Sequence, residues 1–205
     1  MNLSEVDHKN IWHPFTQHQT AKNNIAIVRG EGVLLYDENG KTYIDAVSSW
    51  WTNLFGHSNP KIANAIKHQV DTLEHVIFAG FTHQPAIDLS ENLLEILPKN
   101  QSKIFFSDNG STCVEVALKM AIQFWHNKDI EKQTIVAFKN SYHGDTFGAM
   151  SVGARGLFNQ PFEPFLFDVE FIDLPNDDNF SDVLADFQQI IQQKNVAAFI
   201  FEPLI

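Results

Sequence analysis

The feature that most constrains the fold is a set of short apolar segments in the second half of the sequence, separated by helical stretches. Thr134 to Phe138, Asp168 to Ile172 and Ala197 to Phe201 have the composition of buried strands. A helix is predicted near Asp182 to Gln192, before the last of them. Strands joined through helices favour right-handed crossovers and a mostly parallel sheet. The sequence therefore predicts an α/β fold.

A further strand and helix are predicted on either side of a polar turn. Lys103 to Phe106 is apolar and aromatic, as in a strand, and Ser107 to Gly110 is a cluster of turn-forming residues. A helix is expected from there to about Asn127, with Thr112 and Glu115 as a capping box. The apolar face of this helix is predicted to consist of Cys113, Val116, Ala117, Met120 and Phe124.

The turn itself is a candidate phosphate site. A strand that turns into a helix at Gly110 and Ser111 leaves unpaired N–H groups at the positive end of the helix dipole. These groups lie at the carboxyl edge of the sheet and suit an anion. Most turns of this kind only connect two elements, so the interpretation needs support from elsewhere in the chain.

That support comes from two other strand ends. Asn140 to Ser151 follows a predicted strand, at the edge where open α/β sheets bind ligands. Within it, Tyr142 beside His143 suits stacking on a flat ring, and Glu202 closes the last strand at the same edge. A phosphate cradle, an aromatic face and a carboxylate together favour a flat phosphorylated cofactor, for which pyridoxal phosphate is the obvious candidate.

Two other chemical interpretations lack their sequence patterns. A hydrolase would use Ser141 or Ser111 with His143 and Asp145, but the sequence has no Gly-x-Ser-x-Gly nucleophile elbow. A dinucleotide site would need Gly-x-Gly-x-x-Gly after a strand, and the segment at Gly110 lacks it.

The first half of the sequence predicts a small antiparallel meander followed by helices. Its strands are expected at Ile25 to Val28, Val33 to Tyr36 and Thr42 to Ile44. Helices are expected to begin at Pro60 and near Gln84. The three histidines at positions 8, 13 and 18 share no helical face, so we expect no metal site.

Composition excludes several classes of partner. A formal charge of -11 and a pI of about 5.1 argue against binding to nucleic acid or to an anionic membrane. The single cysteine, Cys113, is expected to pack in the core, which suits a reducing cytoplasm. No secretion signal or membrane-spanning apolar stretch is expected, so the predicted location is cytoplasmic.

The segment from Phe106 to Ala121 resembles the turn and helix of the class III aminotransferases of fold type I. Four other stretches strengthen the resemblance, which covers residues 11–203 and is thinnest between about 153 and 195. They are Ile11 to Thr16, Ser48 to Trp51, Thr82 to Ile87 and Tyr142 to Ser151.

The resemblance implies an incomplete fold-type I transferase that uses pyridoxal 5'-phosphate. It would have a small antiparallel N-terminal segment of the small domain at residues 1–50. Residues 51–205 would form part of the large cofactor-binding domain, a mostly parallel sheet with flanking helices. A homodimer is implied as well.

The resemblance also assigns roles to individual residues. Gly110 and Ser111 would hold the cofactor phosphate, Tyr142 would stack on its ring and Glu202 would lie at its rim. Residues expected in the other roles are Trp50, Trp51 and Phe15 at the substrate, and His143 and Asp145 in support of the Tyr142 loop.

The same stretches imply the branch of the family that serves biotin synthesis. The amino group of S-adenosylmethionine would pass to 8-amino-7-oxononanoate, giving 7,8-diaminononanoate. Phe15 departs from the tyrosine that is common there, which leaves open a different amino donor, such as an amino acid or a diamine.

The Schiff-base lysine of the family and the aspartate that pairs with the pyridinium nitrogen both lie well beyond Pro203. We therefore expect no catalytic lysine in these residues and no aminotransferase activity from the isolated chain. A non-catalytic fragment that needs a partner chain is the other alternative.

Overall fold

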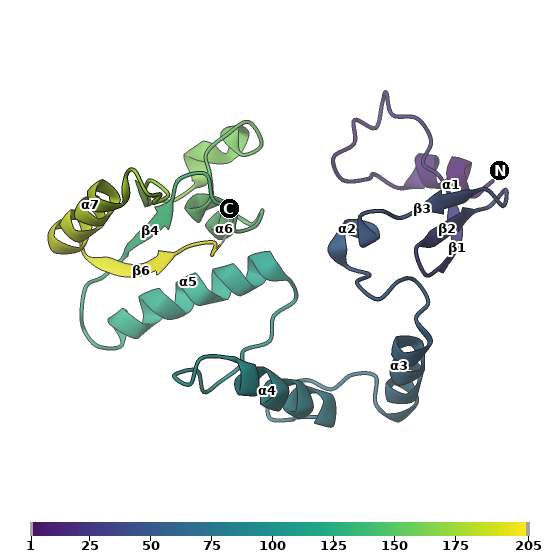
Figure 1. The fold of residues 1–205 in the computed structure, drawn as a ribbon, viewed down its shortest axis with the longest axis horizontal. Coiled ribbons are helices and arrows are strands. Elements are labelled where there is room, and N and C mark those ends of the chain that lie inside the picture. The colour runs from purple at the N-terminus through teal and green to yellow at the C-terminus, as the bar shows by residue number, and fades with distance from the viewer. Residues whose placement is uncertain (1, 204–205) are drawn as a thin grey trace. The chain divides into compact units, whose positions relative to one another are not determined.

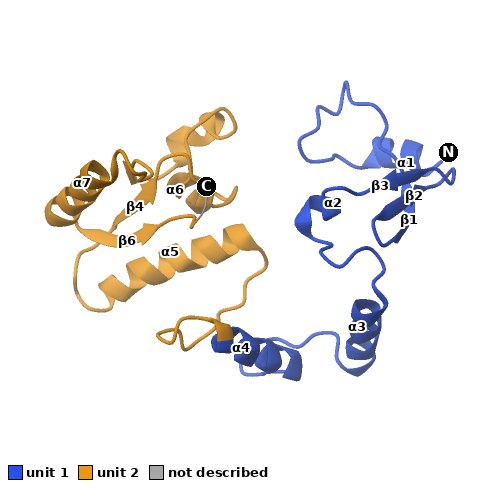
Figure 2. Ribbon diagram, in the orientation of Figure 1, with its two compact units in different colours: residues 1–95 blue, residues 96–205 orange. Residues whose placement is uncertain are grey.

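A computed structural model describes residues 2–203 of the chain. The chain divides into two compact units, residues 1–95 and residues 96–205, which are coloured separately in Figure 2. The domain boundary near residue 50 that the family resemblance implies refers to the complete fold, and it stays a prediction.

The first unit contains a three-stranded antiparallel sheet and four helices. The sheet has the order β1-β2-β3, with Arg29 opposite Tyr36 and Leu35 opposite Tyr43. This confirms the predicted meander, whereas the first helix was not expected in such a polar segment. The elements are α1 (Leu3–Asn10), β1 (Ile27–Glu31), β2 (Leu34–Asp37), β3 (Thr42–Ile44), α2 (Ser48–Trp51), α3 (Pro60–Thr72) and α4 (Gln84–Ile96).

Local hydrogen bonds explain where two of these elements begin and end. The Asp37 carboxylate accepts two backbone N–H groups of the β2–β3 turn, both at 2.9 Å, and Gly40 in that turn has a φ of 80°. The Asn59 side chain caps α3 by accepting the N–H of Lys61 at 3.0 Å, and Pro60 takes the first helical position. The predicted start of α3 is therefore confirmed.

The second unit is built on a three-stranded parallel sheet with the order β5-β4-β6. Its strands β4 and β6 are labelled in Figure 1. The central strand β4 pairs in parallel with both neighbours, which places Phe138 opposite Ile172 and Val136 opposite Phe199. The predicted parallel sheet is thus confirmed. The elements are α5 (Gly110–His126), β4 (Thr134–Phe138), α6 (Phe147–Val152), the short 3-10 helix η1 (Gln160–Phe165), β5 (Glu170–Ile172), α7 (Phe180–Gln193) and β6 (Val196–Ile200).

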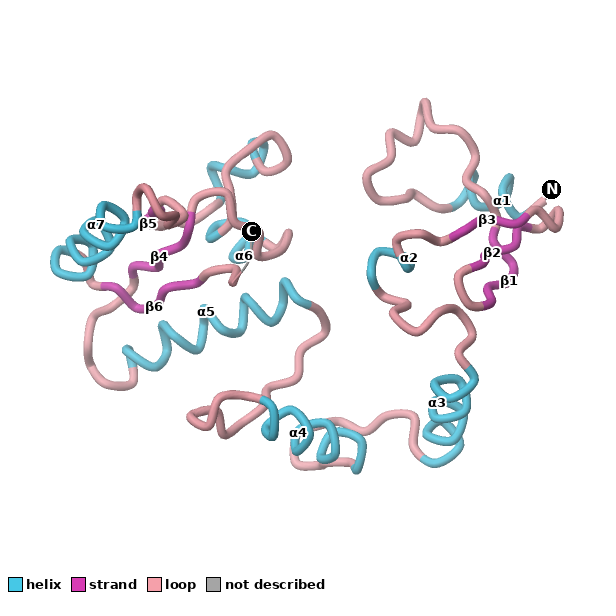
Figure 3. The backbone as a smooth tube through the Cα atoms, in the orientation of Figure 1, coloured by secondary structure: helices cyan, strands magenta, loops and turns pink. Residues whose placement is uncertain are grey.

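Helices cover both faces of this sheet, and alternate residues of β4 point to the two layers. Ile135 and Ala137 pack on one face with Leu118 of α5 and Val152 of α6. On the other face, Val136 packs with residues of β5 and α7. The tube in Figure 3 shows β4 and β6 side by side, with α5 running along them. The packing of helices on both faces fixes the positions of the strand ends, and so the starting points of the loops that leave their carboxyl ends.

The predicted strand at Lys103 to Phe106 does not form. Residues 101–107 have no regular secondary structure, and the stretch pairs with none of β4, β5 and β6. A strand is stabilised by backbone hydrogen bonds to a neighbour, which an apolar composition cannot supply by itself.

The predicted apolar face of α5 is wrong as well. Leu118 is buried and Val114 packs against the same cluster, whereas Cys113 is exposed and Phe124 is half exposed. Because α5 carries apolar residues around most of its circumference, their spacing did not determine which stripe meets the sheet. The expectation that Cys113 is a core residue fails for the same reason.

Candidate functional site

The N-terminus of α5 presents backbone donors at the end of the second unit's sheet. Asn109 is its N-cap: the Asn109 carboxamide accepts the N–H of Thr112 at 2.9 Å, and the Thr112 hydroxyl accepts the N–H of Asn109 at 3.0 Å. The capping box therefore joins Asn109 to Thr112, and not Thr112 to Glu115 as predicted. Among residues 2–203, no group accepts a hydrogen bond from the N–H of Gly110 or Ser111.

These two N–H groups fit the phosphate of a pyridoxal cofactor. A side-chain Cβ built on Gly110 would meet no atom within 4 Å, so the space beside this backbone is open. Two free donors at the positive end of a 17-residue helix favour a bound anion. The local geometry therefore suits the group that the sequence analysis proposed.

The loop after β4 approaches α5 closely at this point. The backbone N–H of Asp145 donates to the Ser111 hydroxyl at 3.1 Å. Gly144 has a φ of 126°, and a Cβ there would lie 2.7 Å from Ser111 Cβ and would overlap its hydroxyl. Both the backbone conformation and the contact require glycine, so Gly144 sets the distance between the loop and the helix.

Tyr142 is held from two sides with its ring exposed. Its backbone N–H donates to Glu202 Oε2 at 2.9 Å, and its hydroxyl donates to Asp145 Oδ2 at 2.8 Å. The ring is 62% exposed, which leaves area for a flat ligand. The hydrogen bond to Asp145, then partial burial and the carboxylate charge, raise the pKa of the Tyr142 phenol. The hydroxyl is therefore protonated at neutral pH.

His143 is the next residue of this loop, and it is partly buried. Burial lowers its pKa, and the charge of Glu202 opposes only part of that shift. His143 Nε2 and the hydroxyl of Thr146 are buried without a hydrogen-bond partner among residues 2–203. The supporting role expected for His143 stays a prediction.

Glu115 also belongs to this arrangement, although the sequence analysis assigned it only to a helix cap. Its carboxylate accepts the N–H of Gly148 at 2.7 Å and so ties α5 to α6. A Cβ on Gly148 would lie 2.7 Å from the Glu115 carboxyl carbon. The link spans 33 residues, which no local sequence pattern could have predicted.

Three aromatic side chains predicted at the substrate lie in the first unit. Phe15 stacks on Trp50 with ring centroids 6.4 Å apart and planes at 7°. Trp50 and Trp51 have centroids 5.6 Å apart and planes at 56°. All three residues are at least 70% exposed, and together they form an exposed aromatic surface.

The two tryptophans sit on an unusual backbone. Residues Ser48, Ser49, Trp50 and Trp51 have φ values of 49°, 47°, 61° and 66°, so four consecutive non-glycine residues are left-handed. The left-handed conformation costs about 1–2 kcal/mol for each such residue. Strain of this kind persists where surrounding contacts impose it, and it is concentrated at functional sites.

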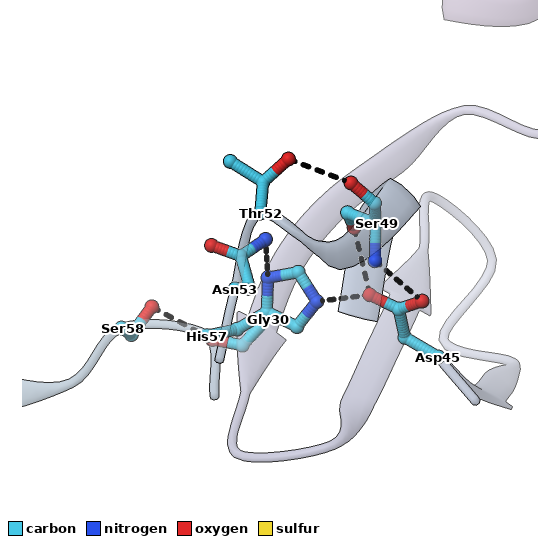
Figure 4. A network of polar contacts seen from close by, with 7 residues as sticks. All are labelled: Gly30, Asp45, Ser49, Thr52, Asn53, His57 and Ser58. Carbon is cyan, nitrogen blue, oxygen red and sulfur yellow. Dashed lines mark hydrogen bonds and ion pairs between the residues drawn. The ribbon is translucent and has the colours of Figure 1, made fainter. Parts of the chain in front are cut away.

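Those contacts come from Asp45 and His57 (Figure 4). Asp45 accepts the Ser49 N–H at 2.9 Å and the Ser49 hydroxyl at 2.7 Å, and its Oδ2 lies 2.8 Å from His57 Nε2. The bonds from Ser49, followed by that from His57, lower the pKa of Asp45 to about 2. Neither Asp45 nor His57 was predicted as a site residue from the sequence. The available signal is an aspartate four residues before a serine, a spacing at which its carboxylate can cap a backbone N–H.

The predicted site residues thus form two groups. Gly110, Ser111, Tyr142, Glu202, His143 and Asp145 lie in the second unit. Hydrogen bonds link four of them, in the order Ser111, Asp145, Tyr142 and Glu202. Phe15, Trp50 and Trp51 lie in the first unit. The roles of these residues toward a cofactor and a substrate stay predictions.

Residues 2–203 contain neither a candidate membrane-spanning helix nor a candidate metal site. No helix in this part of the chain has both the length and the apolar character needed to cross a membrane. No group of three or more His, Cys, Asp or Glu side chains is arranged there to hold a metal ion.

Comparisons with known proteins identify relatives along most of the chain. The family model for the class III aminotransferases matches residues 15–205. The adenosylmethionine-8-amino-7-oxononanoate aminotransferase of Synechococcus elongatus is 49% identical over 206 residues, which cover 97% of this chain and 49% of that protein. The Helicobacter pylori protein of the same name is 40% identical over 211 residues, covering 100% of this chain and 48% of its own length.

Solved structures that resemble the chain are also aminotransferases. The Methanocaldococcus jannaschii adenosylmethionine-8-amino-7-oxononanoate aminotransferase matches with a TM-score of 0.88 and 38% identity, covering 96% of this chain and 45% of that one. An omega transaminase of Pseudomonas jessenii, in complex with PMP, matches with a TM-score of 0.88 and 29% identity. The match covers 100% of this chain and 49% of the transaminase chain. The chain spans about half the length of the curated relatives it matches.

Proposed function

Because this chain belongs to the class III aminotransferase family, we propose that the protein containing it is a pyridoxal phosphate-dependent transaminase of biotin synthesis. It transfers the amino group of S-adenosylmethionine to 8-amino-7-oxononanoate, which yields 7,8-diaminononanoate. The observation that carries this proposal is the arrangement of Ser111, Tyr142 and Asp145 at the free N-terminus of α5. The names of relatives at 40% and 49% identity support the choice of substrates.

In this proposal, the second unit holds the cofactor. The N–H groups of Gly110 and Ser111 bind its phosphate, and the exposed face of Tyr142 covers its ring. Glu202 keeps the Tyr142 backbone in place at the rim of the site. Bound pyridoxal phosphate supplies the carbonyl and the electron-withdrawing ring on which amino transfer depends.

The aromatic surface of the first unit contributes to substrate binding. Phe15, Trp50 and Trp51 offer flat aromatic faces, which suit the aliphatic chain of the keto acid and the sulfonium cation of the donor. Phe15 carries no hydroxyl, so a donor group that a tyrosine would bind loses about 1 kcal/mol of hydrogen-bond energy here.

The test uses the complete reading frame that contains these residues. The purified protein is incubated with pyridoxal phosphate, 8-amino-7-oxononanoate and one donor at a time: S-adenosylmethionine, an amino acid or a diamine. Mass spectrometry of the product is expected to show 7,8-diaminononanoate with S-adenosylmethionine. Product formed with another donor alone would favour a different class III aminotransferase. Absence of product with every donor would favour a non-catalytic protein that needs a partner chain.

We also propose that the complete protein is a cytoplasmic homodimer. The exposed apolar area in each unit, which includes Phe55, Leu157 and Phe158 at 73%, 81% and 87% exposure, is expected to be covered in the complete protein by the rest of the chain and by the second subunit. Sedimentation of the complete protein as a monomer at micromolar concentration would contradict the dimer.

A further inference from the structure

We infer that Asp45 and His57 are positioning residues, which hold Ser48–Trp51 in its left-handed turn and so fix the rings of Trp50 and Trp51. That the orientation of these two rings matters for substrate binding rests on the proposed function. The positioning itself is a property of the chain alone.

The turn needs an external restraint. Its own backbone bonds are all local: the Trp51 N–H donates to the Val47 carbonyl at 2.8 Å, and the N–H groups of Thr52 and Asn53 donate to the Ser48 carbonyl, the latter at 3.0 Å. The Ser48 N–H donates to the Asp45 carbonyl at 3.3 Å. Residues with side chains favour the right-handed region, so four of them in succession relax unless other contacts oppose the change. Asp45 provides that opposition through two hydrogen bonds to Ser49, the second residue of the turn.

The restraint is effective because Asp45 is itself fixed. Its side chain is 7% exposed, and that of His57 is 16% exposed, so water competes poorly for their 2.8 Å contact. The Asp45 backbone N–H also donates to the Val33 carbonyl at 2.9 Å, beside the sheet. The carboxylate therefore has one orientation in which all its partners are satisfied.

His57 is anchored to the β1–β2 hairpin. Its backbone N–H and carbonyl pair with those of Gly32 at 2.8 and 3.1 Å. Its ring packs so closely on Gly30 that a Cβ there would lie 2.8 Å from His57 Cβ. The Nδ1 atom of the His57 ring lies 3.4 Å from the side-chain nitrogen Nδ2 of Asn53. His57 thus links the hairpin to Asp45, and Figure 4 shows its ring between Gly30 and the Asp45 carboxylate.

The orientation of the two indole rings depends on this turn. Trp50 and Trp51 directly follow Ser49, so a change of hand at the turn swings both Cα–Cβ bonds. The observed geometry, with centroids 5.6 Å apart and planes at 56°, would then be lost. Such a pair gives an exciton couplet in the circular dichroism spectrum, whose amplitude depends steeply on separation and tilt.

The experiment measures this couplet in the 205-residue chain, well below its melting temperature. Subtracting the spectrum of Trp50→Phe isolates the signal of the pair. Asp45→Asn removes the carboxylate and is expected to reduce the couplet at least about twofold, because the turn is released from its restraint. Asp37→Asn is the matched control, since Asp37 is a buried carboxylate of the same unit that accepts two backbone N–H groups and contacts neither tryptophan. It is expected to keep the couplet.

A second substitution that restores the couplet distinguishes a role of Asp45 in positioning the turn from an effect on the stability of the whole unit. Ser48→Gly relieves the strain at a residue with a φ of 49°, so in the Asp45→Asn background it is expected to restore most of the couplet. Equal losses in Asp45→Asn and Asp37→Asn, or no rescue, would overturn the inference. If Asp45→Asn does not fold, Ser49→Ala decides, because it removes only the hydroxyl bond to Asp45: a reduced couplet supports the inference and an unchanged one overturns it.

This readout needs neither cofactor nor substrate. A lost couplet in Asp45→Asn would therefore stand even if the complete protein showed no transaminase activity. An active protein whose couplet was insensitive to Asp45 would refute the positioning role alone.

Discussion

The Tyr142 hydroxyl donates a 2.8 Å hydrogen bond to Asp145 Oδ2, and the backbone N–H of Asp145 donates to Ser111 in the helix that presents the proposed phosphate donors. The ring of the proposed stacking residue and the proposed phosphate site are thus joined through one carboxylate-bearing residue. A side-chain substitution at Asp145 is expected to act on Tyr142 directly, because the bond to Ser111 uses the backbone N–H of Asp145.

The first prediction concerns the titration of Tyr142. The bond to Asp145 stabilises the protonated phenol, so the pKa is raised, and Asp145→Asn is expected to bring it back toward its ordinary value. Because the folded-state pKa is the higher one, the stabilisation is present below the unfolded-state pKa and disappears as the pH rises through the folded value. Ultraviolet difference titration measures this pKa, with Tyr142→Phe to assign the signal. An unchanged titration in Asp145→Asn would refute the interaction.

A second prediction concerns Gly144. Alanine there would have to adopt a φ of 126° and would collide with Ser111, so Gly144→Ala is expected to destabilise the chain by about 1–3 kcal/mol. Gly156→Ala is the matched control, because its Cβ would meet no atom within 4 Å and its backbone is not left-handed. Urea unfolding measures both variants. Equal free energies of unfolding for the two would contradict the close approach of loop and helix.

Acid unfolding gives a third prediction. The bonds from Ser49 and His57 lower the pKa of Asp45 from 3.8 to about 2. A lowered folded-state pKa means that Asp45 stabilises the fold above pH 3.8, and that this contribution is lost as the pH falls toward 2. In Asp45→Asn, the dependence of the free energy of unfolding on pH is expected to be shallower across this window. A slope identical to that of the unchanged chain would show that Asp45 is not held as described.

The sequence predicted the elements whose pattern is local. β4 and β3 match their predicted limits, and α3 begins at Pro60 because Asn59 and Pro60 carry its start signal. The loop that contains Tyr142 was located correctly because it follows the buried strand β4. Asp145 was named with it, although its bond to Ser111 depends on tertiary structure.

The predictions were wrong where tertiary contacts determine whether a strand forms or which face of a helix is buried. The apolar stretch before Ser107 has no strand neighbour, and α5 meets the sheet through Leu118, not through the stripe that includes Cys113. The Asp45–His57 contact joins residues 12 positions apart across a left-handed turn. Propensity scales do not anticipate such a turn, because they describe the conformations that each residue prefers alone.

The proposed cofactor site makes a fourth prediction, which uses the first position of α5. Gly110→Pro removes one N–H donor but is compatible with the helix, because proline is favoured at the first helical position and the extended Asn109 suits a following proline. Gly110→Ala keeps the N–H, and its Cβ enters open space. The proline variant is expected to lose about tenfold or more of its phosphate affinity and the alanine variant little, since a hydrogen bond to a charged group is worth about 1.5–3 kcal/mol.

The most direct test of the cofactor site is a nuclear magnetic resonance titration of the 205-residue chain with pyridoxamine 5'-phosphate, repeated for both variants. We predict that the amide signals of Gly110 and Ser111 shift with the phosphorylated ligand and not with pyridoxamine, and that Gly110→Pro weakens binding while Gly110→Ala does not. Equal shifts with pyridoxamine, or equal affinities of the two variants, would contradict a phosphate cradle at the N-terminus of α5.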